Sequence, residues 1–464
     1  MPSIHRRTLL KASALFAGAY GLGLGAANRF SPAFASPDPV LLEAQTAEAM
    51  LADTGPTRGI MTYGADGMPP VLRARQGEPF AARLQNSLDE PTTIHWHGIR
   101  VPNAMDGVPF LTQPYIYTGD GFDYRFTPPD AGTFWYHPHC NTLTQMGRGM
   151  TGLLIVESPA DPVFDSEIVL NLRDWRLGGD GQFIEQFKPR DAAKSGTYGT
   201  LRTANWQREP QYEAASGGLT RLRICVTDVT RIFNFQMEGA EAQVIAIDGN
   251  PVPQRFALET LVLGPGQRLD LALRIPDTEG AVARLMDIRG STPKPVASFR
   301  AIGQSLKRDF GDLAPLAANP VAEPDLSSAT EIPLILSATA ENVSSSSLCG
   351  SIGYSFWAIN KTPWSGDAPD PTAPLAEMKL GKSYVLNIAN PTPHNHPIHL
   401  HGLSFKVVSS SSRDVQPFVS DTYLLQPDEK VKLALVADNP GDWVFHCHII
   451  EHQKTGMAGY LRVI

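Results

Sequence analysis

Apolar and polar residues alternate in several short stretches of this chain, and residues that favour turns bound each stretch. In LVLGPGQRLDLALRI, residues 261–275, the alternation follows a Gly-Pro-Gly turn. In LLQPDEKVKLALVADNPGDWVFHCHI, residues 424–449, one such strand leads through an Asn-Pro-Gly-Asp turn into a second strand. A period of two sends successive side chains to opposite faces, so the pattern predicts β-strands, with residues 261–275 half-buried.

The order of turn, aromatic strand and His-x-His pair occurs twice. It is present in GTFWYHPHC, residues 132–140, after the turn PPDAG, and again in residues 440–448. Residues 264–273 have a similar hairpin without histidines. This weak internal repeat predicts an all-β fold of three Greek-key β-sandwich domains.

Composition changes mark two candidate linkers, residues 157–162 and the Pro/Ala/Ser-rich residues 313–328. The chain has 464 residues, too many for one ordinary core. We therefore predict domains at residues 36–158, 159–318 and 319–464.

The overall composition is that of a globular protein, with 19% charged and 42% hydrophobic residues. The formal net charge of −8 argues against nucleic acid as a partner, because phosphate binding needs a basic surface.

The N-terminal residues 1–35 have the pattern of an export signal. Arg6 and Arg7 precede an apolar run rich in Ala, Gly and Leu, which closes on the small-x-small sequence Ala33-Phe34-Ala35. This pattern resembles a twin-arginine signal and predicts export by the twin-arginine machinery to the bacterial periplasm. A membrane anchor is the alternative, but the run is short, weakly hydrophobic and interrupted by Lys11. No later segment is apolar enough to span a bilayer, so stable membrane insertion is not expected.

The twelve histidines are unevenly distributed, since none lies between Cys140 and Pro393. Apart from His5, in the signal, they form an early and a late group: His95, His97, His137 and His139; then His394, His396, His399, His401, His446, His448 and His452. Eight of them form four His-x-His pairs. Because residues two apart on a strand share a face, each pair can offer two imidazoles to one place. Imidazole is the commonest protein metal ligand, so four pairs predict a cluster of several metals.

Cys447 lies between His446 and His448 and must face the opposite side of the strand. It is therefore placed to bind a separate metal. A thiolate, two imidazoles and a weak axial thioether form the blue-copper electron-transfer site. Cys447, His452 and Met457 supply three of these donors, and His396 is the candidate for the fourth. Zinc also binds Cys and His, but a structural zinc site uses only four ligands.

The remaining three cysteines are Cys140, Cys225 and Cys349. An exported protein favours disulfides, and three cysteines allow one internal bridge, whose partners the sequence leaves open.

The histidine segments closely resemble the multicopper oxidase family, which includes laccases, cuprous oxidases, bilirubin oxidases and ascorbate oxidases. The segments are HWHG (95–98), WYHPH (135–139), HPIHLHG (396–402) and HCHIIEHQKTGM (446–457). The resemblance implies three cupredoxin-like domains and four coppers, with a cluster between the first and third domains. The second domain is then expected to be a scaffold without copper ligands.

The resemblance also implies a ligand set for each copper. The type 1 copper matches His396, Cys447, His452 and axial Met457, and the type 2 copper matches His95 and His399. One type 3 copper matches His97, His137 and His448, and the other matches His139, His401 and His446.

The sequence also suggests roles or locations for three further residues near these motifs. Asp106 matches an acidic position near the family's cluster and is a candidate proton relay, although Asp-Gly also forms turns. His394 has no assigned ligand role and is expected near the ligands or at the surface. Glu451 is expected to be a solvated loop residue.

The resemblance implies an enzyme, expected to be a monomer, that couples one-electron oxidation of a small reductant to four-electron reduction of dioxygen to water. Cys447, His446 and His448 would carry the electrons between sites. Cuprous oxidases often carry methionine-rich insertions, whereas this chain has 11 methionines and no dense cluster. Met146 and Met150 come closest, and core packing explains them. We therefore predict a laccase-like oxidase of phenols and aromatic amines. The alternatives are a periplasmic Cu(I) or Fe(II) oxidase in copper tolerance and, more remotely, a non-catalytic copper-binding or division-associated protein.

Overall fold

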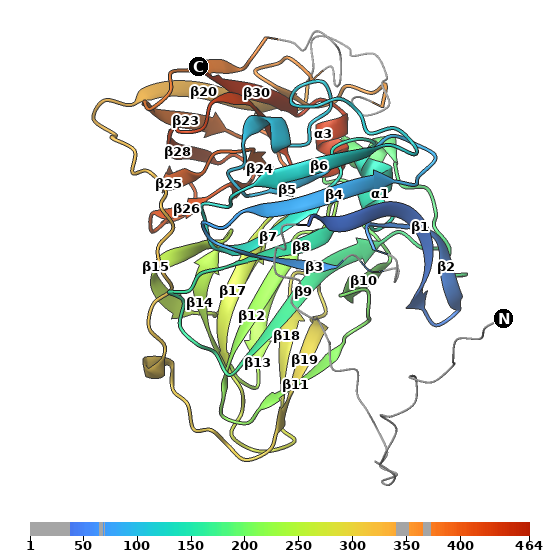
Figure 1. Ribbon diagram of the computed structural model, residues 1–464, viewed down its shortest axis with the longest axis vertical. Coiled ribbons are helices and arrows are strands. Elements are labelled where there is room, and N and C mark those ends of the chain that lie inside the picture. Colours follow the sequence, from blue (N-terminus) through green and yellow to red (C-terminus); the bar gives the residue numbers. More distant parts are fainter. Residues whose placement is uncertain (1–37, 65–67, 69, 340–351, 365–372) are drawn as a thin grey trace, which may run out of the picture. The chain divides into compact units, whose positions relative to one another are not determined.

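The computed structural model describes residues 38–64, 68, 70–339, 352–364 and 373–464, which belong to one compact unit, Ser31–Ile464. The predicted export signal, residues 1–35, lies outside the described residues. No helix in the described part of the chain is long and apolar enough to cross a membrane. Within those residues the strands form six sheets, two in each successive third of the chain (Figure 1).

The first pair of sheets has the strand orders β2-β1-β4-β6 and β3-β8-β7-β5. The sheets enclose an apolar core that includes Trp96, Phe134 and Tyr136. The strands are β1 (Val40–Ala52), β2 (Gly55–Thr62), β3 (Val71–Arg75), β4 (Phe80–Asn86), β5 (His95–His97), β6 (Gly121–Phe126), β7 (Gly132–His137) and β8 (Gly152–Glu157).

The second pair has the orders β10-β9-β12-β17-β14-β15 and β11-β19-β18-β13-β16. Its strands are β9 (Ser166–Trp175), β10 (Leu201–Ala204), β11 (Gln211–Ala215), β12 (Leu219–Val226), β13 (Phe233–Glu238), β14 (Glu241–Ile247), β15 (Asn250–Ala257), β16 (Leu261–Leu263), β17 (Arg268–Arg274), β18 (Val282–Asp287) and β19 (Lys294–Ile302).

The third pair has the orders β21-β20-β23-β28-β25-β26 and β22-β30-β29-β24-β27. Its strands are β20 (Thr330–Ser337), β21 (Ala358–Ile359), β22 (Ala376–Met378), β23 (Ser383–Ala389), β24 (His396–Leu400), β25 (Phe405–Ser410), β26 (Phe418–Ser420), β27 (Thr422–Leu425), β28 (Lys430–Val436), β29 (Gly441–Cys447) and β30 (Ala458–Val463).

Helices are short. The described α-helices are α1 (Thr142–Gly147), α2 (Pro189–Ala192) and α3 (Ile450–Lys454), and the 3-10 helices are η1 (Asn103–Met105) and η2 (Phe310–Asp312).

The same two parallel pairings occur in each third of the chain. The first sheet of each pair contains a parallel pairing, β1 with β4, β9 with β12, and β20 with β23. The second sheet contains another, β3 with β8, β11 with β19, and β22 with β30. Neighbouring strands that are not consecutive in sequence require crossover connections between the sheets, as in Greek-key sandwiches. This part of the strand topology therefore occurs three times along the chain. The exact domain boundaries stay a prediction, although none of the described strands crosses residue 158 or 318.

The prediction for residues 261–275 was wrong in one respect. Residues 264–267 separate β16 from β17, and β17 is buried on both faces rather than half-buried. Its polar side chains meet other parts of the protein instead of solvent: Arg268 bonds Asp421 near β27, and Asp270 accepts a bond from Thr133 in β7. The alternating pattern was read correctly, but the polar face is an interface within the protein.

Candidate metal centre

Strand pairing brings the His-x-His pairs together. In the first sandwich His95 in β5 lies opposite His137 in β7. In the third sandwich His399 in β24 lies opposite His446 in β29. The four pairs form one buried group, here called the eight-histidine cluster: His95, His97, His137, His139, His399, His401, His446 and His448, each at most 6% exposed.

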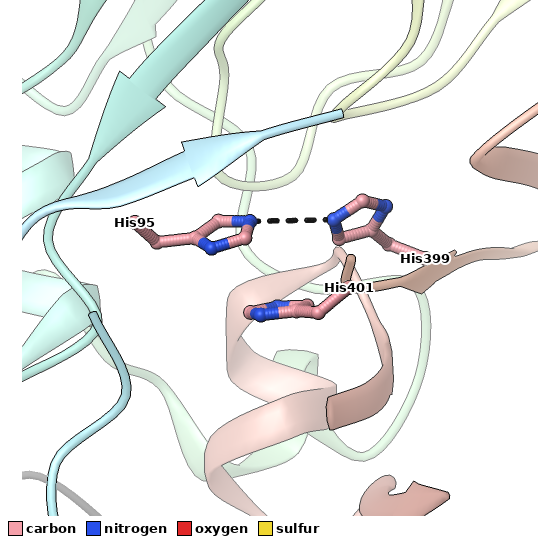
Figure 2. Close-up of side chains that lie close together, drawn as sticks. All are labelled: His95, His399 and His401. Atoms are coloured by element: carbon pink, nitrogen blue, oxygen red, sulfur yellow. Dashed lines mark hydrogen bonds between the residues drawn. The ribbon is translucent and has the colours of Figure 1, made fainter. Parts of the chain in front are cut away.

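Histidines from opposite ends of the sequence touch in this cluster. The Nε2 atoms of His95 and His399 are 3.4 Å apart, and the His95 ring stacks on His401 with centroids 3.7 Å apart (Figure 2). The Nε2 atoms of His401 and His446 are 3.2 Å apart. The first and third sandwiches therefore share the cluster, as the resemblance to the multicopper oxidase family implied.

Several cluster imidazoles have one nitrogen held by a neighbouring group. The Nδ1 atoms of His95 and His401 lie 3.1 and 3.0 Å from carboxylate oxygens of Asp106. The Nδ1 atoms of His399 and His446 bond the carbonyls of Asp421 and Cys447. Such partners fix ring orientation and leave the other nitrogen for a metal.

Other nitrogens in the cluster are buried without a hydrogen-bond partner in the described part of the chain. They are His97 Nδ1, His137 Nε2 and both ring nitrogens of His448. Buried polar atoms are nearly always bonded, so several such atoms facing one place fit a bound metal.

Burial also sets the protonation state. Burial lowers the pKa of the cluster imidazoles well below the ordinary value, and repulsion from neighbouring imidazoles lowers it further. This holds for His97, His137, His139, His401, His446 and His448. These rings are therefore neutral at neutral pH, which is the form that binds metal.

A second group lies on the opposite face of β29. The Sγ atom of Cys447 is 3.6 Å from Nδ1 of His396 and 3.5 Å from Nδ1 of His452. Met457 is fully buried in the same apolar core cluster as Cys447, and its carbonyl accepts a bond from the Cys447 amide. This set of four is called the cysteine site. Its donors are those of a blue-copper centre.

The outer ring nitrogens of the cysteine site are also held. Nε2 of His396 bonds Thr392, and Nε2 of His452 donates to the Lys194 carbonyl at 2.9 Å. Burial lowers the pKa of His452 to about 3 and raises that of the Cys447 thiol. A metal that binds here must therefore displace the thiol proton.

Asp421 was not predicted from the sequence. Its carboxylate is 3.3 Å from His97 Nε2 and 3.4 Å from His399 Nδ1, and Arg268 holds both its oxygens, at 2.7 and 2.6 Å. Burial alone would raise the pKa of Asp421, but the Arg268 guanidinium lowers it below the usual range. An isolated Asp in SDTYLL gives no signal in a single sequence. Arg268 belongs to the second sandwich, which therefore also supports the cluster rather than only spacing its neighbours.

The expectation for Glu451 was wrong. Glu451 is fully buried, accepts a bond from Thr197 Oγ1 at 2.7 Å, and lies 3.4 Å from Arg176. It is inside the protein because the segment around Thr197 covers α3. His394 is partly buried, and its Nδ1 lies 3.2 Å from Ser195 Oγ.

The other cysteines are only partly described. Cys140 is disulfide-bonded, whereas Cys225 and Cys447 are free and buried. Cys349 lies outside the described residues.

Known proteins resemble the chain over most of its length. Residues 45–161, 193–283 and 344–464 each match a sequence profile described as multicopper oxidase. The crystal structure of a multicopper oxidase from Pseudomonas thermotolerans is similar, with 38% identity and a TM-score of 0.83, covering 94% of this chain and 100% of that one. Multicopper oxidase MmcO of Mycobacterium tuberculosis is 29% identical, covering 88% of this chain and 84% of that protein. Laccase-2 of Fomitopsis schrenkii is 26% identical, covering 84% and 83%.

These similarities confirm the predicted fold of three cupredoxin-like sandwiches and the use of type 1, type 2 and type 3 copper. The chain belongs to the multicopper oxidase family, whose members are oxidoreductases that use copper and dioxygen.

Proposed function

We propose that this multicopper oxidase is laccase-like and takes single electrons from phenols or aromatic amines. The observation that carries this proposal is the position of the methionines. Met146 and Met150 are fully buried, and of the described methionines only Met50, in β1, is exposed. A Cu(I) oxidase would benefit from soft thioether ligands at its surface.

We assign the ligands as the family motifs imply. The cysteine site would hold the type 1 copper, and His95 with His399 the type 2 copper. The type 3 coppers would be held by His97, His137 and His448, and by His139, His401 and His446. Close approach within His139, His401 and His446 supports the last set, because one nitrogen of each lies within 4.8 Å of the others.

The chain itself links the two centres. Bound copper supplies the one-electron redox chemistry and the site at which dioxygen is reduced. Cys447 belongs to the cysteine site, and its sequence neighbours His446 and His448 belong to the eight-histidine cluster. The connection from the Cys447 sulfur to either ring is therefore covalent and runs through the adjoining peptide.

We assign Asp106 two tasks. Its carboxylate fixes the orientation of the His95 and His401 rings through their Nδ1 atoms. Reduction of dioxygen to water consumes protons, and a fully buried carboxylate beside the cluster can pass them inward. We also propose export to the periplasm, because residues 1–35 carry the twin-arginine pattern, and a monomeric state.

The test is oxygen uptake by the copper-loaded protein with a panel of phenols and, separately, with Cu(I) and Fe(II). Phenols should support the faster uptake. Faster uptake with a metal ion would favour a metal oxidase over the laccase-like proposal. If none of these reductants drives oxygen uptake, both proposals are refuted.

The ligand assignment has its own test. Cys447→Ser should lose the blue colour and keep the type 2 copper signal in electron paramagnetic resonance. The matched control is Cys225→Ser, which changes the second free buried thiol of the described residues and should stay blue. A blue Cys447→Ser protein would refute the assignment.

A further inference from the structure

A segment of the second third of the chain covers the cysteine site. We call residues 188–198, between β9 and β10, the strap; it includes α2. The Lys194 carbonyl accepts the bond from His452 Nε2 at 2.9 Å, and His452 has no exposed surface. A reductant in solution therefore meets the strap before it meets His452.

The strap is held in place at several points besides His452. Trp357 donates from Nε1 to the Ala192 carbonyl at 2.8 Å, and its ring lies 4.6 Å from the His452 ring. Thr197 is bonded through both its amide and its hydroxyl to the buried Glu451. These contacts hold the strap backbone in place beside the cysteine site, and with it the points from which its outward side chains extend.

The outward side chains of the strap are mainly cationic. Lys188, Arg190 and Lys194 are exposed, and none of them forms an ion pair with another described residue. The strap's single acidic residue is Asp191. With three cations and one acid, the strap carries a local excess of positive charge in a chain of net charge −8.

We propose that the strap selects the electron donor by charge, so that anionic aromatic donors, such as phenolates, aromatic carboxylates or sulfonates, are favoured over metal cations. This inference rests on the proposed function and specifies its substrate class. Each donor loses one electron at the strap, and four such electrons with four protons convert one dioxygen into two waters. Charge attraction raises the local concentration of anions, whereas Cu(I) and Fe(II) are repelled.

Outer-sphere donors of opposite charge test the inference. Ferrocyanide is a tetra-anion and hexaammineruthenium(II) is a dication. In Lys194→Glu the strap charge changes by two units, so kcat/KM for ferrocyanide should fall about tenfold at low ionic strength. The value for hexaammineruthenium(II) should rise a few-fold. Both differences should shrink at about 0.5 M salt, where the Debye length is only a few ångströms.

The matched control is Lys382→Glu, which makes the same charge change beside the N-terminal end of β23. Asn390 follows the C-terminal end of β23 and bonds the carbonyl of His394, which lies beside the strap. Lys382 precedes the N-terminal end of β23, so the whole length of that strand separates it from the strap side. This variant should leave both donors within twofold of the unaltered enzyme. Equal effects of the two variants would mean that only net charge matters, and would overturn the inference.

A second readout does not depend on turnover. Hexacyanocobaltate(III) is a redox-inert trianion, and its binding to the copper-free protein can be measured by calorimetry. Binding should weaken about tenfold in Lys194→Glu and stay unchanged in Lys382→Glu. Binding that is equal in all three proteins would refute the strap as an anion-selecting surface. If that binding is lost in Lys194→Glu while no donor drives oxygen uptake, the strap is an anion-binding surface, but the proposed oxidase function fails and donor selection fails with it.

Discussion

Replacing Arg268 with methionine tests how strongly the second sandwich supports the metal centre. The Arg268 side chain is completely buried and donates to both carboxylate oxygens of Asp421, at 2.7 and 2.6 Å. It also donates to the carbonyls of Thr133 and Gly266, each at 3.2 Å. Arg268→Met leaves the Asp421 carboxylate buried without its cation. Removal of one partner of a buried ion pair costs about 3–5 kcal/mol, so we expect a loss of about 4 kcal/mol in the free energy of unfolding.

The assay is urea unfolding of the copper-free protein, followed by tryptophan fluorescence. A second variant, Arg268→Met with Asp421→Asn, removes both charges. It should recover about 2 kcal/mol or more, because removing both partners of a buried pair costs far less than removing one.

Arg83→Met provides the matched control. Arg83 bonds Asp123 at 2.9 Å, but the two side chains are 45% and 41% exposed. An exposed pair of this kind contributes about 0–1 kcal/mol, so the control should change little. If Arg268→Met costs no more than Arg83→Met, or if the double variant is less stable than Arg268→Met, the buried ion pair does not support the cluster as argued.

Three further predictions concern other positions. Burial raises the pKa of Asp248 to about 7, although the neighbouring Arg268 lowers it. A carboxyl group whose pKa is raised in the folded state stabilises the protein at low pH, and this contribution is lost as the pH rises from about 4 to 7. In urea unfolding, the free energy of unfolding of Asp248→Asn, taken relative to the unaltered protein, should therefore be more favourable at pH 7.5 than at pH 4.5. An equal difference at the two pH values would contradict this. Gly107 has φ +83°, and a Cβ there would lie 1.8 Å from the Ile94 carbonyl oxygen, so Gly107→Ala should lower the thermal midpoint sharply; an unchanged midpoint would refute the clash. Asp106→Ala removes the carboxylate that holds His401 Nδ1 and leaves His95 Nδ1 only the backbone carbonyl of residue 106. Copper retention against a chelator should weaken about 10- to 100-fold, whereas full retention would show that the carboxylate does not orient the rings.

The sequence predicted the cluster well because strand alternation is a local rule. Cys447 faces the apolar core of the third sandwich while His446 faces the cluster, and a period of two is enough to deduce this. Which sandwiches would meet at the cluster was implied by the resemblance to the multicopper oxidase family, and the two histidine groups agree with it.

Contacts between sandwiches could not be predicted in the same way. The polar face of β17 has the pattern of a solvent-exposed face, because alternation does not tell whether water or another sandwich lies opposite. Asp421 and Glu451 were missed or misjudged for the same reason. Each is buried only because a segment distant in sequence, carrying Arg268 or Thr197, packs over it.

The division of the eight-histidine cluster between the first and third sandwiches bears on how the protein is made. His95 and His137 lie in β5 and β7 and leave the ribosome well before β29, which carries His446. A nascent chain therefore cannot assemble the cluster until β29 has been synthesised. Complete metal loading must therefore follow the synthesis of β29. Once it occurs, the bound ions tie together two segments that are distant in sequence, so the loaded protein should resist unfolding and proteolysis in proportion to its affinity for the metal.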